Sequence, residues 1–150
     1  MRRGFMALAL AGLLYIPAAG QDNGAMTTVQ KFTEAFNKGD TKAAVAMCAE
    51  QTYIIDEFAP YEWHGDGACA KWFADYDEWA KKSMVTDGSV MLGSPRHVDV
   101  VGERAYVVVP ADYMFKQNGK PDKETAATIT LVLKRGAGGW RIYAWTWAKS

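Results

Sequence analysis

The chain has 150 residues, of which 49% are hydrophobic and 13% aromatic, and its 17 acidic and 17 basic side chains cancel. A chain of this length forms one domain with one core. Balanced charge gives no electrostatic footprint for nucleic acid, so we expect no nucleic-acid partner. The six Trp and seven Tyr residues instead indicate a domain that surrounds a small, largely apolar molecule.

Residues 1–20 have the pattern of a secretory signal peptide. Arg2 and Arg3 precede an apolar run over residues 5–16, and small residues follow at 18–20. We expect cleavage near Gln21, a single mature domain over residues 21–150, and a periplasmic or secreted protein without membrane attachment. An uncleaved anchor is the alternative, although the apolar run is short for a membrane span. The sequence does not separate general secretion from twin-arginine export.

Two cysteines, Cys48 and Cys69, would enter an oxidising compartment after export. The sequence does not decide between a disulfide and two buried free thiols, because it does not give the distance between the two Cα atoms. Neither cysteine has the spacing of a metal ligand, and the chain has no HExxH, nucleophile-elbow or phosphate-binding motif. We therefore expect neither a metal nor a cofactor.

The first half of the chain predicts three helices. Apolar residues recur every three or four positions over residues 26–38, and Gly39 suits the end of that helix. Asp40 suits the N-cap of a second, shorter helix that reaches residue 47. Apolar and mostly aromatic residues at helical spacing, including Trp72 and Trp79, predict a third helix over residues 66–83. A short strand before that helix contains Asp56.

The second half changes to alternating patterns typical of strands. β-rich runs cover residues 90–101, 104–116, 124–134 and 140–147, and the spacers between them are rich in turn residues. Such spacers predict an antiparallel meander. The order of elements predicts an α+β domain in which three helices pack on a curled antiparallel sheet and leave a cone-shaped apolar pocket.

Two stretches carry a family resemblance: VQKFTEAFNKGDTKAAVAMCAEQTYIID at residues 29–56 and WHGDGACAKWF at residues 63–73. With the order of elements, they resemble the NTF2-like superfamily, in particular the branch that holds the steroid delta-isomerases and the SnoaL-like polyketide cyclases. The resemblance covers the whole mature chain. It implies an NTF2-like cone and a homodimer that forms through the sheet. It leaves the activity open, because this fold hosts many unrelated functions.

Steroid isomerases of this superfamily use a carboxylate base, together with a Tyr and a protonated Asp that donate hydrogen bonds to the enolate. The resemblance places the base at Asp56, the Tyr position at Phe32 and the second Asp position at Thr130. Phe32 has no donor and Thr130 is a weaker one. Losing one such donor costs about 3–4 kcal/mol of transition-state stabilisation. We therefore do not expect steroid isomerisation.

Asp56 is the main candidate for a chemical group. It alternates with Ile54 and Phe58, which places a carboxylate on an apolar wall. Burial raises the pKa of such a group toward the range of a general base, whereas a solvated Asp56 would have no such role. His64 is a candidate for a second proton carrier, with a surface or capping His as the alternative.

Aromatic side chains are the candidates for ligand contacts. Tyr143, Trp145 and Trp147 share one face in strict alternation, and the resemblance turns that face inward, where the rings could stack on a flat ligand. Core packing or a dimer surface explains them as well. Either Asp112 or Tyr113 also faces inward. The full expected set is Phe32, Ile54, Phe58, Trp63, Trp72, Trp79, Tyr113, Thr130, Tyr143, Trp145 and Trp147.

Three functions fit these observations. The pocket could bind a small apolar or aromatic molecule without converting it. It could act as an isomerase, cyclase or dehydratase alpha to a carbonyl, with Asp56 as general base. The sheet could instead be a dimerisation or interaction surface, and a pocket filled by its own aromatic side chains would favour this third function.

Overall fold

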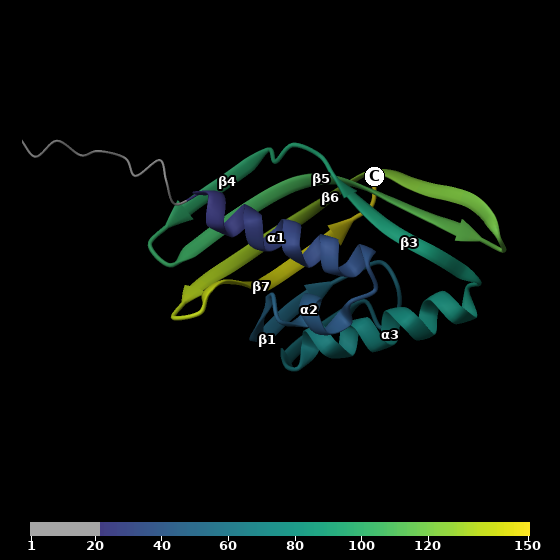
Figure 1. Cartoon of the computed structure of the whole chain (residues 1–150), viewed down its shortest axis with the longest axis horizontal. Coiled ribbons are helices and arrows are strands. Elements are labelled where there is room, and N and C mark those ends of the chain that lie inside the picture. Colours follow the sequence, from purple (N-terminus) through teal and green to yellow (C-terminus); the bar gives the residue numbers. More distant parts are fainter. Residues whose placement is uncertain (1–21) are drawn as a thin grey trace, which may run out of the picture.

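The structure, a computed structural model, describes residues 22–150, so the expected signal peptide lies outside the described residues. Its elements are α1 (Asp22–Asn37), α2 (Thr41–Val45), β1 (Cys48–Ile55), β2 (Glu62–Asp66), α3 (Ala68–Lys82), β3 (Val85–Leu92), β4 (His97–Val101), β5 (Arg104–Gln117), β6 (Lys120–Gly136) and β7 (Gly139–Ala148). The helices pack on a curled sheet, which confirms the predicted α+β class (Figure 1). Within residues 22–150, no helix is long and apolar enough to cross a membrane.

The helices form where the apolar periodicity predicts them. Gly39 takes the left-handed conformation (φ 68°) just after α1, as expected for a helix end. The Asp40 carboxylate accepts a hydrogen bond from the Ala43 N–H at 3.0 Å, which confirms the N-cap of α2. That helix ends at Val45, two residues earlier than predicted.

The sheet has seven strands in the order β2-β1-β7-β6-β5-β3, and β4 also pairs with β5. The predicted meander is confirmed for β5, β6 and β7, which pair antiparallel. The prediction of a fully antiparallel sheet is wrong, because β1 and β7 pair in parallel. A long connection joins these two strands, so no hairpin turn sets their relative direction. The sheet curls without closing, and α3 contacts β1 and β2 at one edge and β3 at the other.

Two differences from the prediction change the number of strands. The single run expected at residues 90–101 is two strands, β3 and β4, separated by a segment that contains Pro95. Proline has no N–H to donate to a ladder, so it interrupts the strand. The second difference is β2, which the sequence did not predict and which pairs with β1.

A β-bulge in β7 changes which face its aromatic residues occupy. Ile142 pairs with Leu133 and Ala144 pairs with Val132, so Tyr143 is an extra residue in this ladder. Tyr143 therefore lies on the outer face, where its ring packs edge-on against Tyr53 with centroids 5.3 Å apart. The prediction that Tyr143 shares a face with Trp145 and Trp147 is wrong for this reason.

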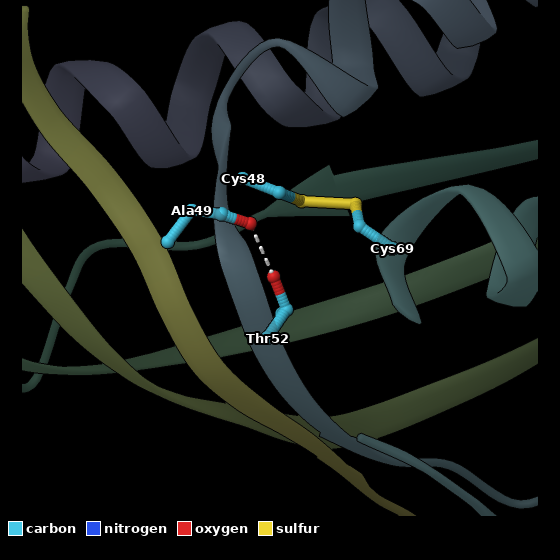
Figure 2. The surroundings of a disulfide bond; sticks show 4 residues. All are labelled: Cys48, Ala49, Thr52 and Cys69. Carbon is cyan, nitrogen blue, oxygen red and sulfur yellow. Dashed lines mark hydrogen bonds between the residues drawn. A yellow bond between two sulfur atoms is a disulfide. The ribbon is translucent and has the colours of Figure 1, made fainter. Parts of the chain in front are cut away.

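A disulfide joins Cys48, at the start of β1, to Cys69, in the first turn of α3 (Figure 2). It settles the choice that the sequence left open. Cys69 lies three residues before Trp72, whose side chain is buried. The crosslink therefore holds the beginning of α3 against the strand that leads to Asp56.

Candidate functional site

A cavity of about 80 Å³ lies between α1, α3 and the inner face of the sheet. A single water occupies about 10–15 Å³, so the cavity holds a small molecule or a few waters. Its walls are almost entirely apolar, and Asp56 and Glu57 are its two charged lining residues. Aromatic rings of the lining pack against one another: Trp72 stacks on Tyr76 with ring centroids 5.5 Å apart.

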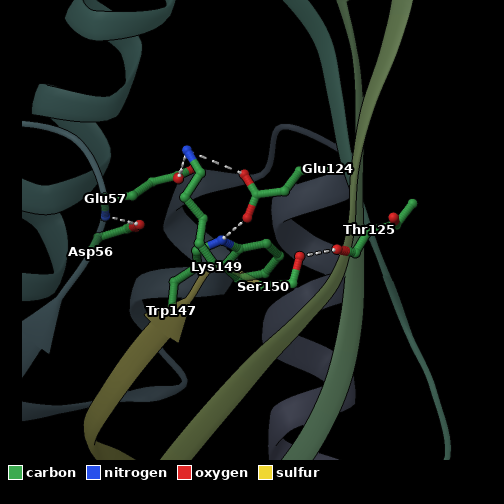
Figure 3. Close-up of polar contacts among 7 residues, drawn as sticks. All are labelled: Asp56, Glu57, Glu124, Thr125, Trp147, Lys149 and Ser150. Atoms are coloured by element: carbon green, nitrogen blue, oxygen red, sulfur yellow. Dashed lines mark hydrogen bonds and ion pairs between the residues drawn. The ribbon is translucent and has the colours of Figure 1, made fainter.

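Asp56 follows the last residue of β1 and is held from several sides. Its own N–H donates to the Tyr61 carbonyl at 3.1 Å, which closes the turn after the strand. The Glu57 N–H donates to Asp56 Oδ1 at 2.7 Å (Figure 3). The Trp72 Nε1–H donates to Asp56 Oδ2 at 2.8 Å. The carboxylate is thus fixed by neutral donors at the cavity wall.

The surroundings of Asp56 favour its neutral form. Burial is the main cause and raises the pKa of Asp56 from 3.8 to about 6. The hydrogen bonds from Glu57 N–H and Trp72 oppose the rise, and the nearby carboxylates of Glu57 and Glu124 add to it. A group with this pKa exists in both protonation states near neutral pH, as a general base requires.

A pair of tyrosines forms the second polar feature of the cavity. The hydroxyls of Tyr76 and Tyr113 lie 2.6 Å apart, and both residues line the cavity. Burial raises the pKa of each phenol above its ordinary value, so both stay protonated. Their mutual hydrogen bond uses one of the two hydroxyl protons. The other proton is therefore free to meet an acceptor on a ligand.

Gly88 in β3 leaves room for this tyrosine pair. A Cβ at Gly88 would overlap the Tyr76 hydroxyl and lie 2.6 Å from the Tyr113 hydroxyl. We expect Gly88→Ala to separate the two hydroxyls and to lower the free energy of unfolding by about 1–3 kcal/mol, the usual cost of overpacking. Urea denaturation measures this loss. Gly136→Ala is the matched control, because nothing lies within 4 Å of its Cβ position. Equal stability of the two variants would contradict the proposed fit.

One buried donor at the cavity has no partner. The Trp145 side chain is only 6% exposed and lines the cavity. Its Nε1–H makes no hydrogen bond to any residue that the structure describes. A buried donor without a partner is costly, so this N–H favours a ligand that brings an acceptor atom.

Charged side chains gather beside the cavity (Figure 3). Lys149 forms an ion pair with Glu57, and its Nζ lies 3.8 Å from Glu124 Oε2. The other oxygen of Glu124 accepts a hydrogen bond from Trp147 Nε1 at 2.8 Å. Because Trp147 and Glu57 line the cavity, this network borders the space that a ligand would occupy.

The structure brings most of the sequence-predicted ligand residues to this cavity. Those that line it with Asp56 are Phe32, Phe58, Trp72, Trp79, Tyr113, Trp145 and Trp147. Ile54 and Trp63 are buried but lie outside the lining, and Trp63 Nε1 donates to Asp75 at 2.8 Å. Thr130 alternates with the lining residues Ile129 and Leu131, so it faces away, as does Tyr143.

His64 lies away from Asp56. It pairs with Tyr53 across the β1–β2 ladder, and both side chains are exposed. Ile54 and Trp63, the neighbouring pair, are buried instead. His64 therefore sits on the outer face, and we give it no role in proton transfer. Within residues 22–150, no group of His, Cys, Asp and Glu side chains has the arrangement of a metal site.

Sequence reasoning missed several lining residues. Tyr76 lies one helical turn after Trp72, so its place on the same face of α3 was readable from the spacing. Glu57 was not readable, because strand alternation would turn it away from Asp56. The strand ends before Asp56, and the following turn brings both side chains to the cavity.

A curled mixed sheet with helices packed around an inner cavity defines the NTF2-like class of fold. A model of the SnoaL-like domain matches residues 25–146, so the chain belongs to the SnoaL-like domain family. No curated protein matches the chain in sequence.

Solved structures share the fold at low sequence identity. An NTF2-like superfamily protein from Salmonella enterica serovar Typhimurium has a TM-score of 0.74 and 16% identity, covering 89% of this chain and 93% of that one. A ketosteroid isomerase-like protein from Erwinia carotovora atroseptica has a TM-score of 0.69 and 16% identity, covering 87% of this chain and 97% of that one. The CaMKII hub of S. rosetta has a TM-score of 0.68 and 19% identity, covering 90% of this chain and 100% of that one. Likeness at this identity shows the fold alone.

Proposed function

We propose that this SnoaL-like domain binds a small aromatic or apolar carbonyl compound and that Asp56 acts as general base on the carbon next to the carbonyl. The feature that supports this most is the half-buried Asp56 carboxylate at the wall of an apolar cavity, whose surroundings raise its pKa to about 6. An exposed carboxylate would have too low a pKa to remove such a proton efficiently.

The geometry supports a simple proton transfer. Each Asp56 oxygen accepts one N–H bond and keeps a lone pair for the substrate. Asp56 takes the proton, the C–H electron pair moves into the carbonyl to form an enolate, and the Tyr76–Tyr113 pair donates the free hydroxyl proton as a hydrogen bond to its oxygen. Returning the proton at another carbon gives isomerisation. Loss of a hydroxyl or attack on a second carbonyl gives dehydration or cyclisation.

Exchange of α-protons tests this proposal without knowledge of the natural substrate. In D2O, the protein should accelerate deuterium incorporation into the methyl group of acetophenone, which proton NMR follows. Tryptophan fluorescence measures binding of the same ketone, because four of the six tryptophans line the cavity. If a panel of aryl ketones binds but none incorporates deuterium, the protein is a binding protein and Asp56 is not a general base.

A second candidate function is an interaction module. The small volume of the cavity favours it, and so do Tyr53, Ile55 and Tyr106, which are 45–57% exposed on the outer face of the sheet. We propose that this face pairs two copies of the chain. Light scattering coupled to size-exclusion chromatography should give about twice the mass of one mature chain. A monomer at micromolar concentration would remove this proposal.

The proposed location is the periplasm or the outside of the cell. The Cys48–Cys69 disulfide supports it, because disulfides persist in oxidising compartments. N-terminal sequencing of the protein from its host should find a mature chain that starts near Gln21. An intact Met1 would contradict export by a cleaved signal peptide.

A further inference from the structure

We propose that the cavity selects aromatic ligands that carry a protonated amine and rejects ligands that carry a carboxylate. This inference names the class of ligand for the proposed function and therefore depends on it. Three observations support this inference: the charges beside the cavity, its aromatic walls and its unpartnered N–H donor.

Negative charge exceeds positive charge at the cavity. Asp56 and Glu57 line it, and Glu124 borders it through Trp147. Within residues 22–150, no Lys, Arg or His lines the cavity. Lys149 is the cation beside it, and it contacts both Glu57 and Glu124. Three carboxylates thus share one ammonium group.

Asp56 has no cationic partner among the described residues. Its two oxygens accept hydrogen bonds from the backbone N–H of Glu57 and from Trp72, which are both neutral donors. Lys149 interacts mainly with Glu57, and its side chain is 62% exposed, so water screens it. A bound cation would therefore supply charge that the protein itself does not provide at Asp56.

The walls suit a cation as well as an aromatic ring. The faces of Trp, Tyr and Phe carry partial negative charge and attract ammonium groups, most strongly where water is excluded. Trp72, Tyr76 and Trp147 line the cavity together with Asp56. An amine in the cavity would have both the Asp56 carboxylate and aromatic side chains in its surroundings.

The unpartnered Trp145 Nε1–H adds a further requirement. It needs an acceptor, and so does the free hydroxyl proton of the Tyr76–Tyr113 pair. A ligand that suits all of these groups has a hydrogen-bond acceptor, an aromatic body and a protonated nitrogen. A carboxylate could also serve as an acceptor, but it would place a further negative charge near Asp56 and Glu57, between apolar walls, at an electrostatic cost.

Benzylamine, benzyl alcohol and benzoate test the order of charge, because they share one ring and differ in the charge of one substituent. Isothermal titration calorimetry at pH 8 should give a Kd for benzylamine about tenfold lower than that for benzyl alcohol, with benzoate weakest. Benzyl alcohol binding as tightly as benzylamine, or benzoate binding best, would overturn the inference while leaving the binding function intact. If none of the three binds while acetophenone does, this inference falls and the proposed function stands. If acetophenone also fails to bind, the proposed function falls with it.

Two variants should move the preference in opposite directions. Lys149→Gln removes the cation and should raise the ratio of benzylamine to benzyl alcohol affinity several-fold. Glu57→Gln removes a carboxylate and should lower that ratio by a similar factor. Glu103→Gln, at an exposed turn outside the cavity lining, is the matched control and should leave the ratio unchanged. A ratio that is the same in all three variants would contradict the electrostatic origin of the selectivity.

Discussion

Replacing Asp56 with asparagine should lower the rate of α-proton exchange in acetophenone by about 10²–10⁴, the usual contribution of a general base. The amide would keep the size of the side chain but could not accept a proton. Ligand affinity for a neutral ketone should change little, because the walls of the cavity stay in place. Proton NMR in D2O and tryptophan fluorescence measure the two quantities on the same samples.

The pH dependence of this exchange reports the same group. Because Asp56 acts in its ionised form, the rate should rise with pH through about 6 and then level off. Asp66→Asn is the matched control, since Asp66 is exposed at the end of β2. Equal exchange by wild type and Asp56→Asn, or loss of exchange in Asp66→Asn, would contradict the role of Asp56.

The stability of the protein should fall as pH rises from about 3.8 to about 6 because of Asp56, and level off above that. The pKa of this carboxyl is raised in the folded state, from 3.8 to about 6, mainly by burial. Well below pH 3.8 the group is protonated in both states and costs nothing. Above pH 6 it is charged in both states, and the folded state bears the cost of a buried charge. The shift corresponds to about 3 kcal/mol between pH 3 and pH 8.

Urea denaturation of wild type and Asp56→Asn over this pH range isolates the effect. An amide at this position loses one acceptor for the N–H groups of Glu57 and Trp72, but that loss does not vary with pH. The difference in the free energy of unfolding should therefore change by about 3 kcal/mol from pH 3 to pH 8, in favour of the variant at high pH. Parallel curves would show that Asp56 titrates as a solvated group.

The sequence predicted the fold well, because helix periodicity and strand alternation are local signals. Gly39 and Asp40 marked the junction of the first two helices, and both take the predicted roles. The parallel pairing of β1 with β7 was not readable, since it joins residues far apart in the chain. Pro95 was a readable signal for the break between β3 and β4 that the single predicted strand ignored.

The cavity residues were predicted less completely, and the errors have local causes. Asp56 reaches the cavity as alternation suggested, although it lies just beyond the strand. The bulge at Tyr143 reverses the alternation of β7, and an insertion of one residue leaves no clear mark in the sequence. Thr130 was placed by matching the Gly-Ala-Gly turn at residues 136–138 to the family, and a shift of one residue turns a strand side chain to the other face.

The most direct test of the proposed general base is the pKa of the Asp56 carboxyl. It can be measured by ¹³C NMR on the folded protein with and without a bound aryl ketone. We predict a resonance that titrates near 6, is absent from Asp56→Asn and shifts when the ketone binds beside it. A carboxyl that titrates near 3.8 and does not respond to the ketone would place Asp56 in bulk water and leave the proposed proton transfer without a base.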